Sequence, residues 1–227
     1  VLILLTLIVF VTTYITLQES REINDRISSV NQPSTKLLQE LKTSVLETRL
    51  FLITWLKERK EHEDKVKLVQ YQNEIYPETK KELEHLSKSW TVDQQDSLNK
   101  LFADIELLFQ AQQNDVISIL QVFEDYEEPM NLFLAENSME AGGDIHYYYN
   151  EVLSELNELI STQKMYAQRA NENMFAQFET LKFLVRTLGI ALIIIGVVIA
   201  LYTTKTIVDP IKKLKVIAVK LGRGVFP

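Results

Sequence analysis

The residues best suited to bind a ligand are Thr48 and its neighbour Arg49. An arginine guanidinium can hold a carboxylate through two parallel hydrogen bonds, and Thr48 would add a hydroxyl group from within a run of regularly spaced apolar residues. The alternative, that Arg49 forms a salt bridge on the surface or at a dimer interface, is the interpretation we favour. Thr48 and Arg49 remain the first part of a candidate ligand site.

Two further candidates, Trp55 and Gln163, occupy positions where a helix would place apolar side chains. Trp55 could form an aromatic wall with part of the run Tyr147–Tyr149, although packing in a core explains it better. Gln163, like Gln112, could line a polar pocket or could only fix the register of packed helices. The candidate ligand-binding residues are therefore Thr48, Arg49, Trp55 and Gln163.

Other kinds of chemistry find no support in the residue patterns. The three histidines (His62, His85 and His146) are scattered and lack the spacing of metal ligands, and there is no cysteine. The acidic segment 124–128 lacks the alternating ligands and the central glycine of a calcium loop. No nucleophile–base set, phosphate loop or catalytic carboxylate pair is recognisable, so we predict no catalytic residue, no cofactor and no metal site.

Charge divides the 227 residues into compartments. Residues 1–17 and 187–204 carry no charge, and residues 205–227 hold six basic groups and one acidic group, net +5. Residues 18–186 hold 18 basic and 30 acidic groups, net −12. An acidic middle argues against nucleic acid as a partner.

The two uncharged runs predict two membrane spans, because a helix of roughly 20 apolar residues crosses a bilayer. Residues 1–17 would be a first transmembrane helix, truncated at its cytoplasmic end; the core of a signal peptide is the alternative. Residues 187–207 would form the second; a buried core helix is the alternative. Positive residues favour the cytoplasmic side, which places 208–227 inside and 18–186 outside the cytoplasmic membrane.

The middle region predicts helices rather than strands. Six glycines and five prolines provide few turns, which disfavours all-β and Rossmann-like folds. Helices are expected over about 18–59, 61–89 and 91–123 and from Asp144 into the second span, with a kink or short break at Pro33 and a bend at Pro77. The segment 124–144 is the best loop, with a possible helical turn over 130–136.

Apolar residues in three of these helices recur at alternating steps of three and four, which is the spacing of a packed seam. Short connections between four such helices favour an up-down-up-down arrangement. The expected fold is all-α: a membrane-anchored antiparallel four-helix bundle with two transmembrane helices. The seams are Leu38, Leu41, Val45, Thr48, Leu52 and Trp55; Leu98, Leu101, Ile105, Leu108, Gln112, Val116 and Leu120; and Tyr149, Leu153, Leu156, Ile160, Gln163, Ala167, Ala170 and Met174.

The tail has the most specific pattern in the chain. A proline is followed by a leucine four residues later, a small residue eight later, an aliphatic eleven later and a glycine fourteen later. This order resembles the first helix of a HAMP domain, and residues 208–227 are interpreted as its start; a basic amphipathic helix on the membrane surface is the alternative. The residues that would transmit a signal are Pro210, Ile211, Leu214, Ala218, Leu221 and Gly224.

The middle resembles the four-helix-bundle sensor domain of methyl-accepting chemotaxis receptors and related histidine kinases. The resemblance rests on Pro33-x-x-x-Leu37-Leu-x-x-Leu41, on Trp90-Thr-x-x-Gln94-Gln95 and on the leucine-rich run from Leu153 to Gln163. It implies a homodimeric receptor in a bacterial inner membrane that senses a small molecule or a periplasmic partner protein. A histidine kinase output is favoured over a chemotaxis one.

A different class of function remains open at this stage. A two-span helical hairpin could scaffold membrane partners without transmitting a signal. Codons after Pro227 that encode a second HAMP helix, followed by a kinase or a methylation coiled coil, would favour the receptor.

Overall fold

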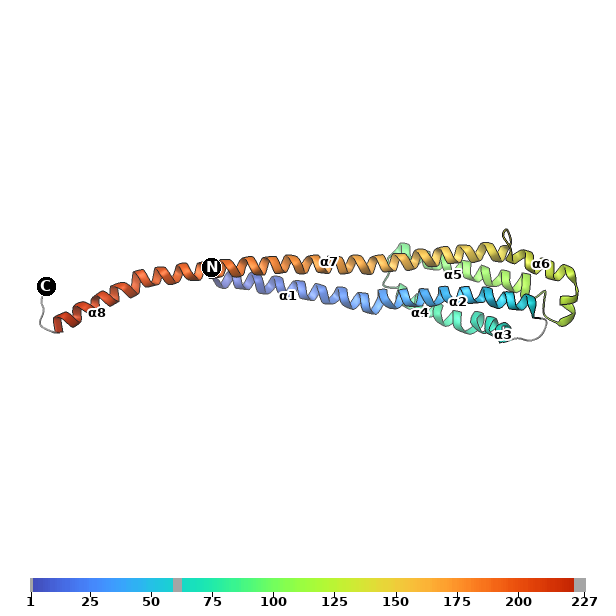
Figure 1. Ribbon diagram of the computed structural model, residues 1–227, viewed down its shortest axis with the longest axis horizontal. Coiled ribbons are helices and arrows are strands. Elements are labelled where there is room, and N and C mark those ends of the chain that lie inside the picture. The colour runs from blue at the N-terminus through green and yellow to red at the C-terminus, as the bar shows by residue number, and fades with distance from the viewer. Residues whose placement is uncertain (1, 59–62, 223–227) are drawn as a thin grey trace. The chain divides into compact units, whose positions relative to one another are not determined.

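A computed structural model describes residues 2–58 and 63–222, and every regular element in these residues is helical (Figure 1). The all-α prediction is confirmed. The elements are α1 (Leu2–Arg26), η1 (Ile27–Asn31), α2 (Gln32–Lys57), α3 (Glu63–Gln70), η2 (Tyr71–Ile75), α4 (Tyr76–Ser87), α5 (Val92–Gln112), η3 (Gln113–Ile117), η4 (Phe123–Glu127), α6 (Pro129–Met139), α7 (Asp144–Thr203), η5 (Thr204–Val208) and α8 (Asp209–Gly222).

The chain divides into two compact units. One unit comprises Ile23–Asn171 and contains the apolar core. The other combines the residues up to Glu22 with those from Glu172 onward.

Three prolines are accommodated by the same local device. Pro33, Pro77 and Pro210 each follow a five-residue π turn, η1, η2 and η5 respectively. In each case the residue before the proline donates its N–H to the carbonyl five residues earlier, as Gln32 does to Ile27. A proline cannot donate to the carbonyl four residues back and its ring crowds that carbonyl, so the wider turn relieves the clash.

At Pro33 and Pro77, where a kink or short break and a bend are expected, a π turn interrupts the α-helical hydrogen bonding and connects one helix directly to the next. At Pro210, η5 joins α7 to α8 without an intervening loop. The expected second helix reaches Ser87 rather than Ser89, and its start at Glu61 lies outside the described residues.

The core of the 23–171 unit follows the predicted seams closely. All six seam residues of α2 and all seven from Leu98 to Leu120 are buried. In α7, Tyr149, Leu156, Ile160 and Gln163 are buried and Leu153 packs partly buried against the core, whereas the last three seam residues, Ala167, Ala170 and Met174, are only half-buried. Val152 and Leu159 are also buried although the seam omits them, because a helix in a globular core buries a wider face than a two-position stripe.

The connection before α7 differs most from the sequence prediction. The expected third helix ends at Ile117 rather than Phe123, and much of the expected loop is helix α6. Pro129 stands at the first position of α6, where a missing N–H costs nothing. A turn at Gly142, whose φ is 102°, then leads into α7 at Asp144, where the fourth helix was expected to begin.

Polar pairs identify the neighbouring helices in this unit. Lys80 of α4 pairs with Glu106 of α5, and Lys100 of α5 pairs with Glu155 of α7. Lys42 of α2 donates to Asn157 of α7, and α2 also contacts α3 and α4. Exposed ion pairs contribute about 0–1 kcal/mol each, so the shared apolar core provides most of the stability.

The other unit contains α1 up to Glu22, the part of α7 from Glu172 onward, η5 and α8. The segment Pro129–Ala218, which includes α7, is the one stretch in the described residues that is long and apolar enough to cross a membrane. Its most apolar window has a mean hydropathy of 2.7 and none of it is buried. Thr12 and Thr16 of α1 line a common groove with Ala176 and Thr180 of α7, so these two helices are neighbours within the unit.

Candidate functional site

Thr48 belongs to a polar cluster that is closed within the core. Its Oγ1 donates to the Val45 carbonyl at 2.7 Å and accepts from Gln112 Nε2 at 3.4 Å. Gln112 Oε1 in turn accepts from Gln72 Nε2 at 2.6 Å. Thr48 and Gln112 are fully buried, so these hydrogen bonds offset the desolvation of both side chains.

Arg49 lies at the surface beside this cluster. Its guanidinium carbon lies 5.1 Å from the centre of the Tyr149 ring, a cation–π geometry. Burial raises the pKa of the Tyr149 hydroxyl, and the nearby Arg49 charge opposes that rise. The cavity that Arg49 and Tyr149 border has a volume of only about 10 Å³. It has room for about one water molecule and not for an organic ligand.

Trp55 is held by a paired network with Lys65, Leu120 and Tyr126, which we call the Trp55 network. Trp55 Nε1 donates to the Leu120 carbonyl at 2.9 Å, and the Tyr126 hydroxyl donates to the Trp55 carbonyl at 2.8 Å. Lys65 Nζ donates to the Tyr126 oxygen at 2.8 Å and lies about 5 Å from both ring centres.

Burial also changes the acid–base properties of this network. It raises the pKa of Tyr126 to about 12, with a smaller contribution from the Asp125 charge. Desolvation lowers the pKa of Lys65, and the Glu58 charge opposes that shift. The polar atoms named in the network all have partners, which fits packing of the Trp55 ring better than an open aromatic wall.

Gln163 is separated from the other three candidates. Its Oε1 accepts from Asn31 Nδ2 at 3.1 Å. Asn31 precedes Thr48 by 17 residues, roughly 25 Å along a helix. The four predicted ligand residues therefore do not form one site: Thr48 and Arg49 lie together, whereas Trp55 and Gln163 lie toward opposite ends of the core.

Gln163 borders a cavity of about 300 Å³, which we call the Trp90 cavity. Arg26, Ile27, Val30 and Asn31 come from the end of α1 and from η1, and the turn before α5 together with the first turn of α5 provides four more residues. Such a volume is at the lower end of the range for small-molecule pockets. The lining residues are Ile23, Arg26, Ile27, Val30, Asn31, Ser89, Trp90, Thr91, Gln94, Gln163, Tyr166 and Ala170.

Local hydrogen bonds fix the wall of this cavity. Trp90 Nε1 donates to Ser34 Oγ at 3.2 Å. Gln94 Oε1 accepts from the Thr91 N–H at 3.1 Å, which caps the first turn of α5. Arg26 Nη2 donates to the Ser89 carbonyl at 3.1 Å. The turn is thus tied to α1 and α2 at two points.

Two buried donors in this wall have no partner. Gln94 is 8% exposed and Gln163 is 1% exposed, and Nε2 of each makes no hydrogen bond. An unpaired buried polar group costs about 1–3 kcal/mol. Natural cores rarely retain two such groups beside one cavity without a reason.

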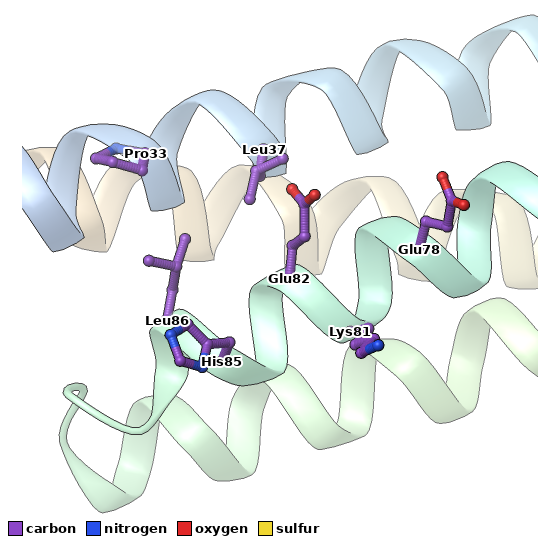
Figure 2. Close-up of a pocket in the computed structure, with 7 residues that line it drawn as sticks. All are labelled: Pro33, Leu37, Glu78, Lys81, Glu82, His85 and Leu86. Carbon is purple, nitrogen blue, oxygen red and sulfur yellow. The ribbon is translucent and has the colours of Figure 1, made fainter.

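A second hollow is a shallow groove between α2 and α4 (Figure 2). Pro33 and Leu37 come from α2, and Glu78, Lys81, Glu82, His85 and Leu86 come from α4. Its volume is about 760 Å³, and most of its polar side chains are exposed to solvent. No unpartnered buried donor lines it, so it lacks the feature that marks the Trp90 cavity.

Metal-binding geometry is not found in the part of the chain that the structure describes: no group of three or more acidic or histidine side chains is close enough to hold an ion. In the tail, Pro210, Ile211, Leu214 and Ala218 lie in α8, and Ile211 and Leu214 are exposed. Leu221 is within α8, but its side chain and the whole of Gly224 lie outside the described residues.

Comparison with known proteins adds no identification. The chain matches no protein-family model, no curated protein and no solved structure.

Proposed function

We propose that this chain is the sensory and membrane-spanning part of a bacterial signal-transducing receptor. The observation that carries the proposal is the continuity of α7, a single helix of 60 residues. Its first part contributes Ile145, Tyr149 and Leu156 to the bundle core. Its last part is the uncharged run that begins at Thr187, and η5 then connects it to the amphipathic α8.

The proposed ectodomain is an antiparallel up-down-up-down four-helix bundle formed by residues 18–186. Contacts at the two ends of the core support this arrangement. Ser34, near the start of α2, bonds Trp90, which precedes α5, whereas Trp55 near the end of α2 bonds Leu120 after α5. The α3–α4 segment and α7 each connect one end to the other, so successive helices alternate in direction.

The proposed membrane topology has two spans, residues 1–17 and 187–207. The acidic region between them faces the outside of the cytoplasmic membrane, and the basic tail from residue 208 faces the cytoplasm. Positive residues are retained on the cytoplasmic side during insertion, which supports this orientation. The tail would be the first helix of a HAMP domain followed by an output module, for which a histidine kinase is favoured over a chemotaxis signalling domain.

A homodimer is part of the same proposal. Ile211 and Leu214 of α8 are 58% and 65% exposed in a single chain. Apolar residues repeated at alternating steps of three and four are buried when two parallel helices pack together. In the receptor, a ligand or a periplasmic partner protein would bind one bundle arrangement better than another and shift the population toward it.

Cross-linking in membranes tests the receptor arrangement. The chain has no cysteine, so single-cysteine variants need no other change. Leu214→Cys, on the stripe, should form a disulfide-linked dimer under mild oxidation. Val216→Cys, on the opposite face of a paired helix, is the matched control and should react far less. No dimer at Leu214, Ala218 or Leu221, or equal dimer at Val216, would contradict paired HAMP helices.

Labelling with a membrane-impermeant maleimide tests the topology. In intact cells with a permeable outer layer, Ser97→Cys in the exposed part of α5 should be labelled, and Lys213→Cys in the tail should be labelled only after lysis. Labelling of both cysteines from the same side would exclude the two-span topology.

A further inference from the structure

The Trp90 cavity carries a specific chemical preference. We infer that it binds a small organic monocarboxylate with a short aliphatic or aromatic body. The inference deepens the proposed function by naming a class of ligand, and it rests on that proposal for its link to signalling. The binding itself is a property of the cavity and can be tested separately.

The donors of the cavity call for a ligand that accepts hydrogen bonds. The bond from the Thr91 N–H fixes the orientation of the Gln94 amide and leaves its Nε2 group unpartnered. The bond from Asn31 does the same for Gln163. Two amide donors without partners would be satisfied by two acceptor oxygens.

The charge of the cavity selects an anion. Arg26 is one of the lining residues, and none of the twelve is acidic. Arg26 uses one of its N–H groups for the Ser89 carbonyl, and a guanidinium has five such donors. A carboxylate would therefore meet two amide donors and one cation. The ammonium group of an amino acid would meet no counter-charge, so a zwitterion is disfavoured.

The rest of the wall is apolar and determines the body of the ligand. Ile27 and Trp90 are buried, and Ile23, Val30 and Ala170 also line the cavity. A volume of about 300 Å³ accommodates a short chain or one ring. Inorganic phosphate would leave this apolar surface unfilled, and its second charge would be costly to bury. The preferred ligand therefore combines one carboxylate with a compact hydrocarbon group.

A ligand at this position would contact the π turn η1. Ile27, Val30 and Asn31 belong to this turn, which connects α1 to α2. π turns within helices are frequent at functional sites, and Asn31 of this turn donates to the same Gln163 amide whose Nε2 the ligand would bond. The cavity is thus placed where occupancy can act on the helix that leads to the proposed first span.

The test uses tryptophan fluorescence of the full chain in detergent micelles. The chain has two tryptophans, and Trp55→Phe leaves Trp90, which lines the cavity, as the single reporter. Benzoate and butyrate are the probes, and benzamide, butyramide, alanine and inorganic phosphate are the comparison compounds. Saturable change in Trp90 emission with the two carboxylates, and a weaker response to the others, is the expected result.

Variants locate the binding. Gln94→Leu and Gln163→Leu should each weaken benzoate binding about tenfold, the effect of losing one hydrogen bond to a charged group. Ala170→Leu fills the cavity without removing a polar group and should abolish binding. Gln112→Leu, a buried glutamine outside this cavity, is the control and should leave the affinity unchanged. Circular dichroism checks that each variant is folded.

Three results would each overturn the inference. The first is the absence of any saturable response to benzoate and butyrate at millimolar concentrations. The second is an equal response to the amides, and the third is binding that survives Ala170→Leu. The outcomes separate this inference from the receptor proposal: if Leu214→Cys still cross-links while the carboxylates fail to bind, the ligand class is wrong and the receptor proposal stands.

Discussion

The two tryptophans of the chain stand in contrasting surroundings. Trp55 and Trp90 are nearly equally buried, at 8% and 7% exposed, and each donates its indole N–H to an oxygen. Around Trp55 the hydrogen bonds close into a network with Lys65 and Tyr126. Around Trp90 there is a cavity of about 300 Å³ with two unpartnered amide donors.

This difference indicates how the core divides its roles. A fully paired and close-packed region holds one arrangement, because any displacement breaks hydrogen bonds and dispersion contacts together. A region with a cavity and unpaired donors has free energy to gain when a ligand enters. The Trp55 network is therefore interpreted as the fixed end of the bundle and the Trp90 cavity as the responsive end.

The largest expected difference between the two ends is in the cost of truncation. Trp55→Ala should lower the free energy of unfolding by about 3–5 kcal/mol, as removal of a well-packed aromatic side chain does. Trp90→Ala should cost less, because a side chain that borders a cavity has fewer contacts to lose. Denaturant unfolding of the full chain in micelles, followed by circular dichroism, measures both. Equal costs would remove the basis of the comparison.

Enlarging a small side chain should also destabilise the Trp55 end more than the Trp90 end. Ala135 in α6 has no exposed surface, so Ala135→Leu should destabilise the bundle by about 1–3 kcal/mol through overpacking. Ala170→Leu should extend into the Trp90 cavity and change stability by less than about 0.5 kcal/mol. Ala103→Leu, at an exposed position of α5, is the control for helix propensity. A large decrease in the free energy of unfolding for Ala170→Leu would indicate that the cavity cannot accommodate a leucine side chain.

Much of the fixed part of the core could be predicted from the sequence. The seam from Leu38 to Trp55 and the seam from Leu98 to Leu120 are buried as predicted. The spacing of apolar residues along one helix shows which face is buried, and this spacing can be read from the local sequence. The sequence places the end of the third helix too late, because the π turn η3 changes the helical register without any proline to signal it, and it predicts α6 only as a helical turn over 130–136.

The responsive end could be predicted only in part. Gln163 was selected because it is a polar residue at an apolar position. Gln94 stands out in the sequence only as part of the pattern Trp90-Thr-x-x-Gln94-Gln95, and Arg26 and Asn31 have no distinguishing signal. Asn31 and Gln163 are separated by 132 residues, so their meeting depends on how the whole bundle packs. A cavity is a property of that packing and not of any local pattern.

Alkaline pH should act on the fixed end through Tyr126. Its pKa rises from an ordinary value of 10.0 to about 12 in the folded chain. Below pH 10 the hydroxyl is protonated in both states; between pH 10 and 12 the unfolded chain loses the proton more readily, so the folded state loses stability as the pH rises through this window. Urea unfolding at a series of pH values measures this loss. The Tyr126→Phe variant should lose less stability between pH 10 and 12. If its free energy of unfolding falls as steeply with pH as that of the unmodified chain, other groups cause the loss.

The smallest stability effect is expected where a donor is already unpaired. Gln94→Met removes the bond that Gln94 accepts from the Thr91 N–H, which is worth about 0.5–1.5 kcal/mol. It also removes a buried Nε2 group whose desolvation no partner offsets. The two terms oppose each other, so the free energy of unfolding should change by less than about 0.5 kcal/mol, as measured by urea denaturation near neutral pH.

Gln112→Met, which breaks two hydrogen bonds in the closed Thr48 cluster, should be clearly more destabilising. If Gln94→Met were the more costly of the two, Gln94 would be a structural cap and the Trp90 end would be as fixed as the Trp55 end; a neutral result would mean that the fold does not depend on the Gln94 amide.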